Sequence, residues 1–139
     1  MPHPALALLV NIDVDDLDRA VTFYGATFGL TVGRRFGADG VEMLGATSPL
    51  YLLARAPGTR AAPGLSQART YARHWTPVHL DFVVEAIEPV MEKAVRAGAK
   101  VEAPIASHDW GRIAMLADPF GHGFCLIQFH GRGYDEIAT

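Results

Sequence analysis

The strongest constraint on the fold is an internal repeat, in which one pattern of side chains occurs twice in a chain of 139 residues. Residues 8–14 and 78–84 both largely alternate apolar and polar side chains. Period-two alternation is typical of a strand with one face on a hydrophobic core. Each segment is followed by apolar residues at helical spacing, and the first large ones, Leu17 and Ile87, stand 70 positions apart. Two copies of a strand–helix–three-strand unit therefore account for the whole chain.

Capping and turn residues mark the ends of the predicted helices. Asp15 and Asp16 favour a helix start after the first strand, and Gly29 is placed to end that helix. In the second unit Pro89 is tolerated in the first helical turn, and Gly98 follows the helix end. The predicted organisation is one domain, 1–139, with module one at about 5–55, a linker at about 56–75, module two at about 76–130 and a tail at 131–139.

Composition excludes several classes of protein. Hydrophobic residues make up 50% of the chain and charged residues 19%, which suits a packed core rather than a disordered chain. The net charge is −3 and no basic block stands out, so we expect neither a nucleic-acid partner nor a membrane partner. No apolar run approaches the ~20 residues of a membrane span. The single cysteine excludes an internal disulfide, and we expect a soluble cytoplasmic protein.

Three segments resemble the vicinal-oxygen-chelate superfamily, which includes glyoxalase I, bleomycin-resistance proteins and extradiol dioxygenases. They are Asp16–Tyr24 with Phe28–Leu30, then His79–Val84, and finally Ala117–Phe124 with its Asp-Pro-Phe-Gly turn. Their order and spacing cover nearly the whole chain. The resemblance implies an α+β fold of two tandem βαβββ modules whose curled mixed sheets surround a cavity, the glyoxalase/bleomycin-resistance fold. It does not fix a reaction, because one fold hosts many chemistries.

The resemblance also implies where a metal would bind. Metal-dependent members usually place a His or Glu ligand on the first and last strand of each module, and leave open positions for a substrate. These four positions fall on Leu9, on the neighbourhood of Leu53 with Tyr51 and Ala54, on His79 and on Cys125. Leucine cannot ligate a metal, so His79 is the one metal candidate among them. We expect no cofactor; the alternative is one divalent metal ion.

The candidate polar floor of the cavity consists of Asn11, His79 and Asp81. The alternation predicts that all three face the concave side, opposite the helices, because Leu80 and Phe82 with their first-strand counterparts occupy the helix-facing side. His79 is the candidate catalytic residue, as a ligand or general base, and a hydrogen-bonded core histidine is the alternative. Asn11 and Asp81 are candidate ligand-binding residues, and the alternative is a solvated face.

Five further residues are candidates for ligand binding. Trp75, Trp110 and Arg112 are expected at cavity mouths, where indole and guanidinium groups suit an anionic or aromatic ligand, although ordinary loop packing would explain them equally. Tyr51 neighbours the second ligand position. Cys125 stands at the fourth position, but between two apolar strand residues it is better explained as a small buried hydrophobe. The linker arginines are expected to be solvated charges: Arg55, Arg60, Arg69 and Arg73.

Two functions remain open from the sequence. The first is a metal-independent protein of the bleomycin-resistance or sequestration type that binds a small polar or anionic organic molecule. The second is a metal-dependent lyase, isomerase or dioxygenase. We also expect a homodimer, because each module leaves sheet edges that need covering and small members of the superfamily usually pair chains. Tyr134 and Ile137 are unusual in a free tail, so we expect the tail to cover a partner chain or a cavity mouth.

Overall fold

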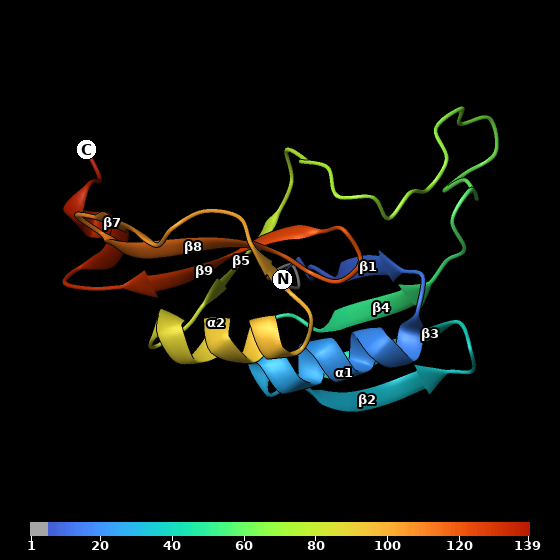
Figure 1. Ribbon diagram of the computed structural model, residues 1–139, viewed down its shortest axis with the longest axis horizontal. Coiled ribbons are helices and arrows are strands. Elements are labelled where there is room, and N and C mark those ends of the chain that lie inside the picture. The colour runs from blue at the N-terminus through green and yellow to red at the C-terminus, as the bar shows by residue number, and fades with distance from the viewer. Residues whose placement is uncertain (1–5) are drawn as a thin grey trace, which may run out of the picture.

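The computed structural model describes residues 6–139 (Figure 1). Module one contains β1 (Val10–Val14), α1 (Leu17–Phe28), β2 (Thr31–Phe36), β3 (Gly40–Leu44) and β4 (Leu50–Ala54). Module two contains β5 (Leu80–Val83), α2 (Ile87–Arg96), β6 (Lys100–Val101), β7 (Ala106–His108), β8 (Gly111–Ala117) and β9 (Gly123–Phe129), and a 3-10 helix, η1 (Gly133–Glu136), follows.

Each module is a mixed sheet with one helix on one face. The strand order is β1-β4-β3-β2 in the first sheet and β5-β9-β8-β6 in the second, where β7 also pairs with β8. In both sheets the first strand runs parallel to the last, and the other ladders are antiparallel. This is the βαβββ unit in duplicate, except that β6 and β7 of module two share the edge of β8 that a single strand occupies in module one. The predicted α+β fold class is confirmed. The two sheets remain separate and do not close into a barrel.

The two helices begin by different means. Asp16 caps α1 by accepting a 3.0 Å hydrogen bond from the Arg19 backbone N–H, and Gly29 ends the helix in the left-handed conformation at φ 69°. α2 has no capping side chain at Ala86. Instead, Gln128 on β9 accepts a hydrogen bond from the Ile87 N–H at 3.0 Å. The start of α2 is therefore fixed by a residue 41 positions away.

Both first strands are shorter than the alternation predicted. β1 begins at Val10, and residues 8 and 9 lie outside it with exposed side chains. β5 begins at Leu80, and Val78 is 85% exposed. The partners explain the difference: the β1 ladder starts opposite Leu50, directly after Pro49, and the β5 ladder starts opposite Phe124. Within residues 6–139 neither ladder continues beyond those positions to hold the extended segments.

The modules meet through their helices and first strands. α1 contacts α2, and the Phe28 and Phe82 rings stack with their centroids 4.0 Å apart. β1 and β5 are the outer strands of their sheets at this junction, and within residues 6–139 no hydrogen-bonded ladder joins them. Side-chain packing, rather than a strand-to-strand ladder, therefore joins the two modules.

The linker carries ion pairs rather than only solvated charges. Arg69 Nε lies 2.8 Å from Asp13 Oδ2, and Arg73 Nε lies 2.6 Å from Glu102 Oε2. The sequence expectation is wrong for these two arginines, because the linker crosses back over both modules and brings them to carboxylates. Figure 1 shows the linker in green as a long excursion away from the helices.

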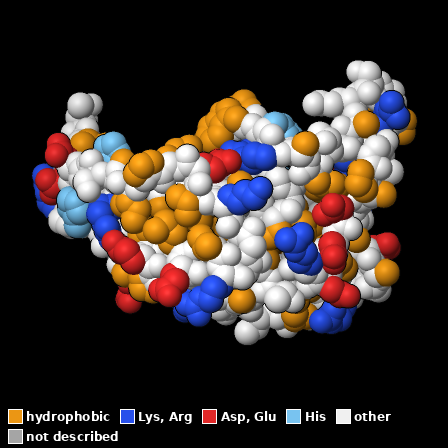
Figure 2. Space-filling model, in the orientation of Figure 1, with side chains coloured by type: hydrophobic (Ala, Val, Ile, Leu, Met, Phe, Trp, Pro, Cys, Tyr) orange, Lys and Arg blue, Asp and Glu red, His pale blue; other side chains and the backbone are white. Residues whose placement is uncertain are grey.

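The tail folds onto module two. Tyr134 of η1 packs against Phe129 and Trp110, with ring centroids 4.7 and 5.3 Å away. Figure 1 shows the C-terminus at the end of the molecule distant from module one. Figure 2 shows Lys and Arg interspersed with Asp and Glu over the viewed face, without a single basic block. In the described part of the chain, neither helix has the length and apolar composition needed to cross a bilayer.

Candidate functional site

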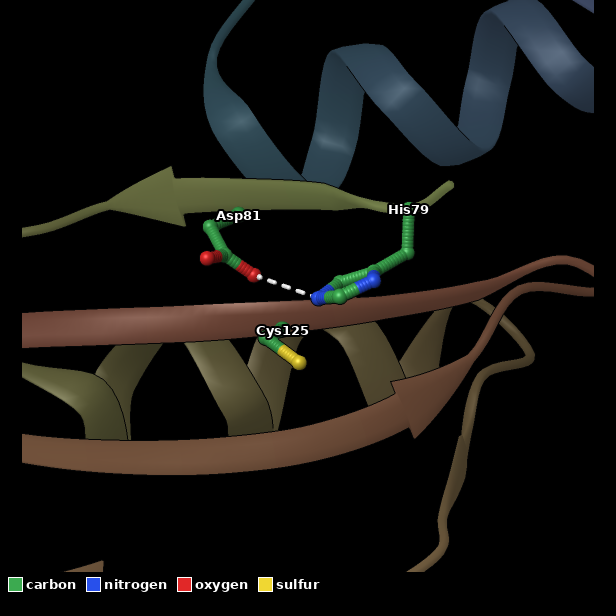
Figure 3. Close-up of side chains that lie close together, drawn as sticks. All are labelled: His79, Asp81 and Cys125. Atoms are coloured by element: carbon green, nitrogen blue, oxygen red, sulfur yellow. Dashed lines mark ion pairs between the residues drawn. The ribbon is translucent and has the colours of Figure 1, made fainter. Parts of the chain in front are cut away.

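Three side chains with acid–base or ligand chemistry gather on module two: His79, Asp81 and Cys125, the His79 cluster. Asp81 is two residues after His79, so both point to the same side of the chain (Figure 3). Cys125 on β9 is the register partner of Asp81 in the parallel ladder, which places its sulfur on that same face. One donor atom from each residue lies within 4.8 Å of the others.

The three residues of the His79 cluster differ in charge and in protonation. His79 Nε2 lies 3.4 Å from Asp81 Oδ1, and both side chains are about one-third exposed. Burial, followed by the charge of Asp81, raises the pKa of Cys125 to about 11. The thiol therefore stays protonated near neutral pH and is a poor nucleophile there. The chemistry available is an imidazole that can exchange a proton, held beside a carboxylate.

A cavity of about 540 Å³ lies between the modules where β1 and β5 approach each other. We call it the β1–β5 cavity. Its walls are mainly apolar, and Asn11, His79 and His122 add polar groups. The remaining lining residues are Leu8, Leu9, Val10, Ile12, Asp13, Tyr24, Thr76, Val78, Leu80, Phe82, Gly123 and Phe124. An apolar body with a few placed polar groups is typical of a small-molecule site.

The predicted polar floor is divided between two spaces. Asn11 and His79 line the β1–β5 cavity, whereas Asp81 lines a second cavity beyond it. Leu80 and Phe82 pack against the core as predicted, but they also line both cavities, which we did not expect. The reason is that β5 is an outer strand at the junction, so each cavity reaches past its edge to the helix-facing side.

Tyr51 belongs to a separate polar network on module one. Its hydroxyl donates a 2.9 Å hydrogen bond to Glu42 Oε2, and Arg34 Nη2 lies 2.7 Å from the same carboxylate oxygen. The hydrogen bonds from Arg34 lower the pKa of Glu42 to about 2. Tyr51 lines neither cavity. The side chains of Arg34, Glu42 and Tyr51 are therefore hydrogen-bonded to one another.

The other three predicted ligand-binding residues are not among the lining residues of either cavity, although Trp75 lies beside one of them. Trp75 is 54% exposed and its ring lies 5.1 Å from that of His79. Trp110 stacks on His108. Arg112 pairs with Glu88 at the start of α2, and the hydrogen bonds between them lower the pKa of that carboxyl to about 2. Trp110 and Arg112 are not among the lining residues of either cavity, and Trp110 also packs against Tyr134 of the tail.

Sequence reasoning missed three polar lining residues: His122, Tyr24 and Thr76. His122 Nε2 lies 2.7 Å from the Asp13 backbone oxygen, which ties the turn after β8 to β1. Its position directly after the Asp-Pro-Phe-Gly turn was a usable signal. No comparable sequence signal marked Tyr24, because its helical spacing fits a core residue equally well.

The residues at the four implied ligand positions do not fit a four-ligand metal site. Leu9 offers no donor, and Leu53 offers none either. Tyr51, the neighbouring option, is bonded to Glu42. Among the described residues, the His79 cluster is the one group of close donors, and all three come from module two.

Comparisons with known proteins agree with this architecture. The glyoxalase-like domain family matches residues 9–127. A protein of Mycobacterium bovis, described as uncharacterised, is 30% identical over 126 residues, which are 88% of this chain and 82% of that protein. The anthracycline biosynthesis protein DnrV of Streptomyces peucetius is 30% identical over 131 residues, 93% of this chain but 43% of that protein. The chain thus spans less than half of DnrV.

Solved structures give the same fold at lower sequence identity. The fosfomycin resistance protein FosX of Listeria monocytogenes superposes with a TM-score of 0.69 at 16% identity, over 98% of this chain and 100% of FosX. A glyoxalase/bleomycin resistance protein/dioxygenase family enzyme of Burkholderia phytofirmans superposes with a TM-score of 0.69 at 20% identity, over 88% of this chain and 97% of that one. These structures share the fold, and the family match over residues 9–127 shows that the chain belongs to the glyoxalase-like domain family.

Proposed function

We propose that the chain binds a small polar or anionic organic molecule in the β1–β5 cavity, without a four-ligand metal site. The observation that carries the proposal is the cavity itself, about 540 Å³ with apolar walls and imidazole and amide groups among them. Its volume falls in the range of pockets that hold drug-sized ligands. The name of DnrV adds support, because that relative serves the biosynthesis of an organic small molecule.

The charge of the cavity favours a polar or anionic group on the ligand. Asp13 is the one lining carboxylate, and its charge is paired with Arg69. The imidazoles of His79 and His122 can each donate a hydrogen bond to the ligand. Asn11 adds an amide donor and acceptor. The ligand's polar end would lie against these three residues, and its apolar body against the leucine, valine and phenylalanine walls.

His79 is the residue that could add chemistry to binding. Asp81 lies against Nε2 of its ring, so the imidazole is held beside a carboxylate at the cavity wall. This arrangement supports a proton transfer to or from a bound ligand. Binding does not require it, so the proposal does not depend on catalysis.

A metal-dependent lyase, isomerase or dioxygenase is the second candidate. The proximity of three donor atoms in the His79 cluster favours it. Against it, leucines stand at the first-module positions that the resemblance implies, so module one contributes no donor there. The metal content of the purified protein separates the two candidates.

Titration with 1-anilinonaphthalene-8-sulfonate, an anionic aromatic fluorophore, tests the proposal. We expect one site whose affinity falls about 3- to 10-fold in His79→Ala and in Asn11→Ala, because each loses one hydrogen-bonding partner. Thr76→Trp, at a lining position of this cavity, should abolish binding. Ala46→Trp, which adds the same side chain to the second cavity, is the matched control. Undiminished binding in both His79→Ala and Thr76→Trp would refute the proposal.

A further inference from the structure

A second cavity lies on the other side of the junction, with a volume of about 590 Å³. We call it the α1–β5 cavity. Its walls come from the end of α1, the turn between β3 and β4, the strand β5 and the helix α2. Val10, Leu80 and Phe82 line both cavities and so form the partition between them. Nothing in the proposed function uses this second space.

Thr27 gives the α1–β5 cavity an unused hydrogen-bonding group. This residue of α1 lines the cavity and is 2% exposed. Its Oγ1 atom is buried and has no hydrogen-bond partner in the described part of the chain. A buried hydroxyl without a partner costs stability, and the large majority of such groups are satisfied. A valine would fill nearly the same volume without that cost, so packing alone does not explain a threonine here.

The other lining residues of the α1–β5 cavity define which ligand could hydrogen-bond to the Thr27 hydroxyl. The stacked rings of Phe28 and Phe82 both line the cavity and provide aromatic surface. Asp81 and Lys93 are its charged lining residues, one of each sign. Their formal charges cancel, so the cavity does not select for a net charge on its contents.

We propose that the α1–β5 cavity binds a second small molecule, neutral and predominantly apolar, whose hydroxyl or carbonyl group hydrogen-bonds to Thr27 Oγ1. The hydroxyl is both donor and acceptor, so either group satisfies it. The aromatic wall favours a flat ring system. This site differs from the β1–β5 cavity in ligand class, because its lining includes one ammonium and one carboxylate, whereas the other cavity offers two imidazoles.

The test uses 6-propionyl-2-(dimethylamino)naphthalene, a neutral aromatic ketone whose fluorescence reports the polarity around it. We expect the wild-type protein to bind one equivalent of it at this site. Thr27→Val should weaken binding by roughly 3- to 10-fold, the effect of one hydrogen bond, without lowering the thermal midpoint of the free protein. Unchanged or higher thermal stability shows that the variant is folded.

Two tryptophan variants show which of the two cavities binds the probe. Ala46→Trp adds an indole to the turn that lines the α1–β5 cavity and should abolish binding. Thr76→Trp adds the same group to the β1–β5 cavity and should leave binding unchanged. No binding by the wild type, equal affinity in Thr27→Val, or loss in Thr76→Trp with retention in Ala46→Trp would each overturn the proposal. The anionic probe of the other cavity gives the opposite pattern, so the two proposals fail separately.

Discussion

The Tyr24 hydroxyl donates a 2.6 Å hydrogen bond to Asp118 Oδ2, and both side chains are buried. Tyr24 lies on α1 of module one, whereas Asp118 begins the turn between β8 and β9 of module two. The other oxygen, Oδ1, accepts the backbone N–H groups of Phe120 and His122 at 2.8 and 2.9 Å. Burial, followed by the charge of Asp118, raises the pKa of Tyr24 well above its ordinary 10. The Asp118 carboxylate thus holds the turn of module two and also accepts a hydrogen bond from α1 of module one.

Removing that hydroxyl is expected to weaken the junction between modules. Tyr24→Phe leaves Asp118 Oδ2 buried without its donor, which should lower the free energy of unfolding by about 1–3 kcal/mol. Urea unfolding followed by circular dichroism measures the change. Tyr134→Phe, at a half-exposed tyrosine, is the control and should stay within about 0.5 kcal/mol of wild type. Equal stability of the two variants would show that the bond does not hold the modules together.

The Arg34–Glu42 pair predicts a pH-dependent contribution to stability. Hydrogen bonds from Arg34 lower the folded-state pKa of Glu42 to about 2 from an ordinary 4.5. A carboxyl with a depressed folded pKa stabilises the fold above its unfolded pKa, and this contribution is lost as pH falls through the folded value. Glu42→Gln should therefore be less stable than wild type at pH 7, and the difference should shrink between about pH 5 and pH 2.

Urea midpoints measured at a series of pH values give that difference directly. Glu92→Gln is the matched control, because its carboxylate pairs with Arg96 while 71% exposed, and exposed pairs contribute little. A gap between wild type and Glu42→Gln that stays constant from pH 7 to pH 2 would contradict the assignment.

Local patterns predicted much of the fold because they depend on neighbours in sequence. Asp16 and Gly29 act through backbone groups within one turn of α1, so its start and end could be predicted. The offset of 70 residues between Leu17 and Ile87 revealed the duplication, which no single segment could have shown. The alternation predicts that His79 and Asp81 share a side of the chain, although Asp81 lines a different cavity from Asn11 and His79. Cys125 joins them through the parallel register that the βαβββ unit imposes.

The site was harder to predict because its residues meet through tertiary contacts. Arg112 combines features of a ligand-binding residue, yet it pairs with Glu88, 24 positions away. Thr27 has the spacing of any buried helical residue, and only its missing partner in the folded chain distinguishes it. The two cavities exist because β1 and β5 approach without pairing, which a periodic pattern in either strand cannot reveal.

The thiol of Cys125 should be slow to alkylate in the native protein. The side chain is 3% exposed, and burial raises its pKa to about 11, so little thiolate is present at pH 8. It is the one cysteine of the chain, so labelling by iodoacetamide, followed by mass spectrometry, reports on this residue alone. We expect labelling in urea to be at least about 10-fold faster than in buffer. Equal rates would mean that the native thiol is accessible and ionised.

Metal content tests the absence of a four-ligand site. Protein purified without a histidine tag should carry well under one equivalent of Zn, Ni, Mn or Fe by elemental analysis, because the first-module positions hold leucines. His79→Ala should leave the trace content unchanged. Stoichiometric metal in the wild type that disappears in His79→Ala would overturn this prediction and favour the metal-dependent candidate.

Pairing of two chains is the remaining proposal about assembly. β2 forms the far edge of the first sheet, and β6 with β7 forms that of the second. An open edge presents unpaired backbone groups. The tail exposes about half of Tyr134 and of Ile137 at the end of module two, and it lines neither cavity. We propose a homodimer in which the tail contributes to a twofold interface of at least ~1,000 Å².

Sedimentation at micromolar concentration should give twice the monomer mass of 15.0 kDa. Replacing Tyr134 and Ile137 together by aspartate should shift the equilibrium toward monomer, because two charges would be buried against the partner. A wild-type species of 15.0 kDa would refute the dimer, whereas a dimer insensitive to the double substitution would exclude the tail from its interface.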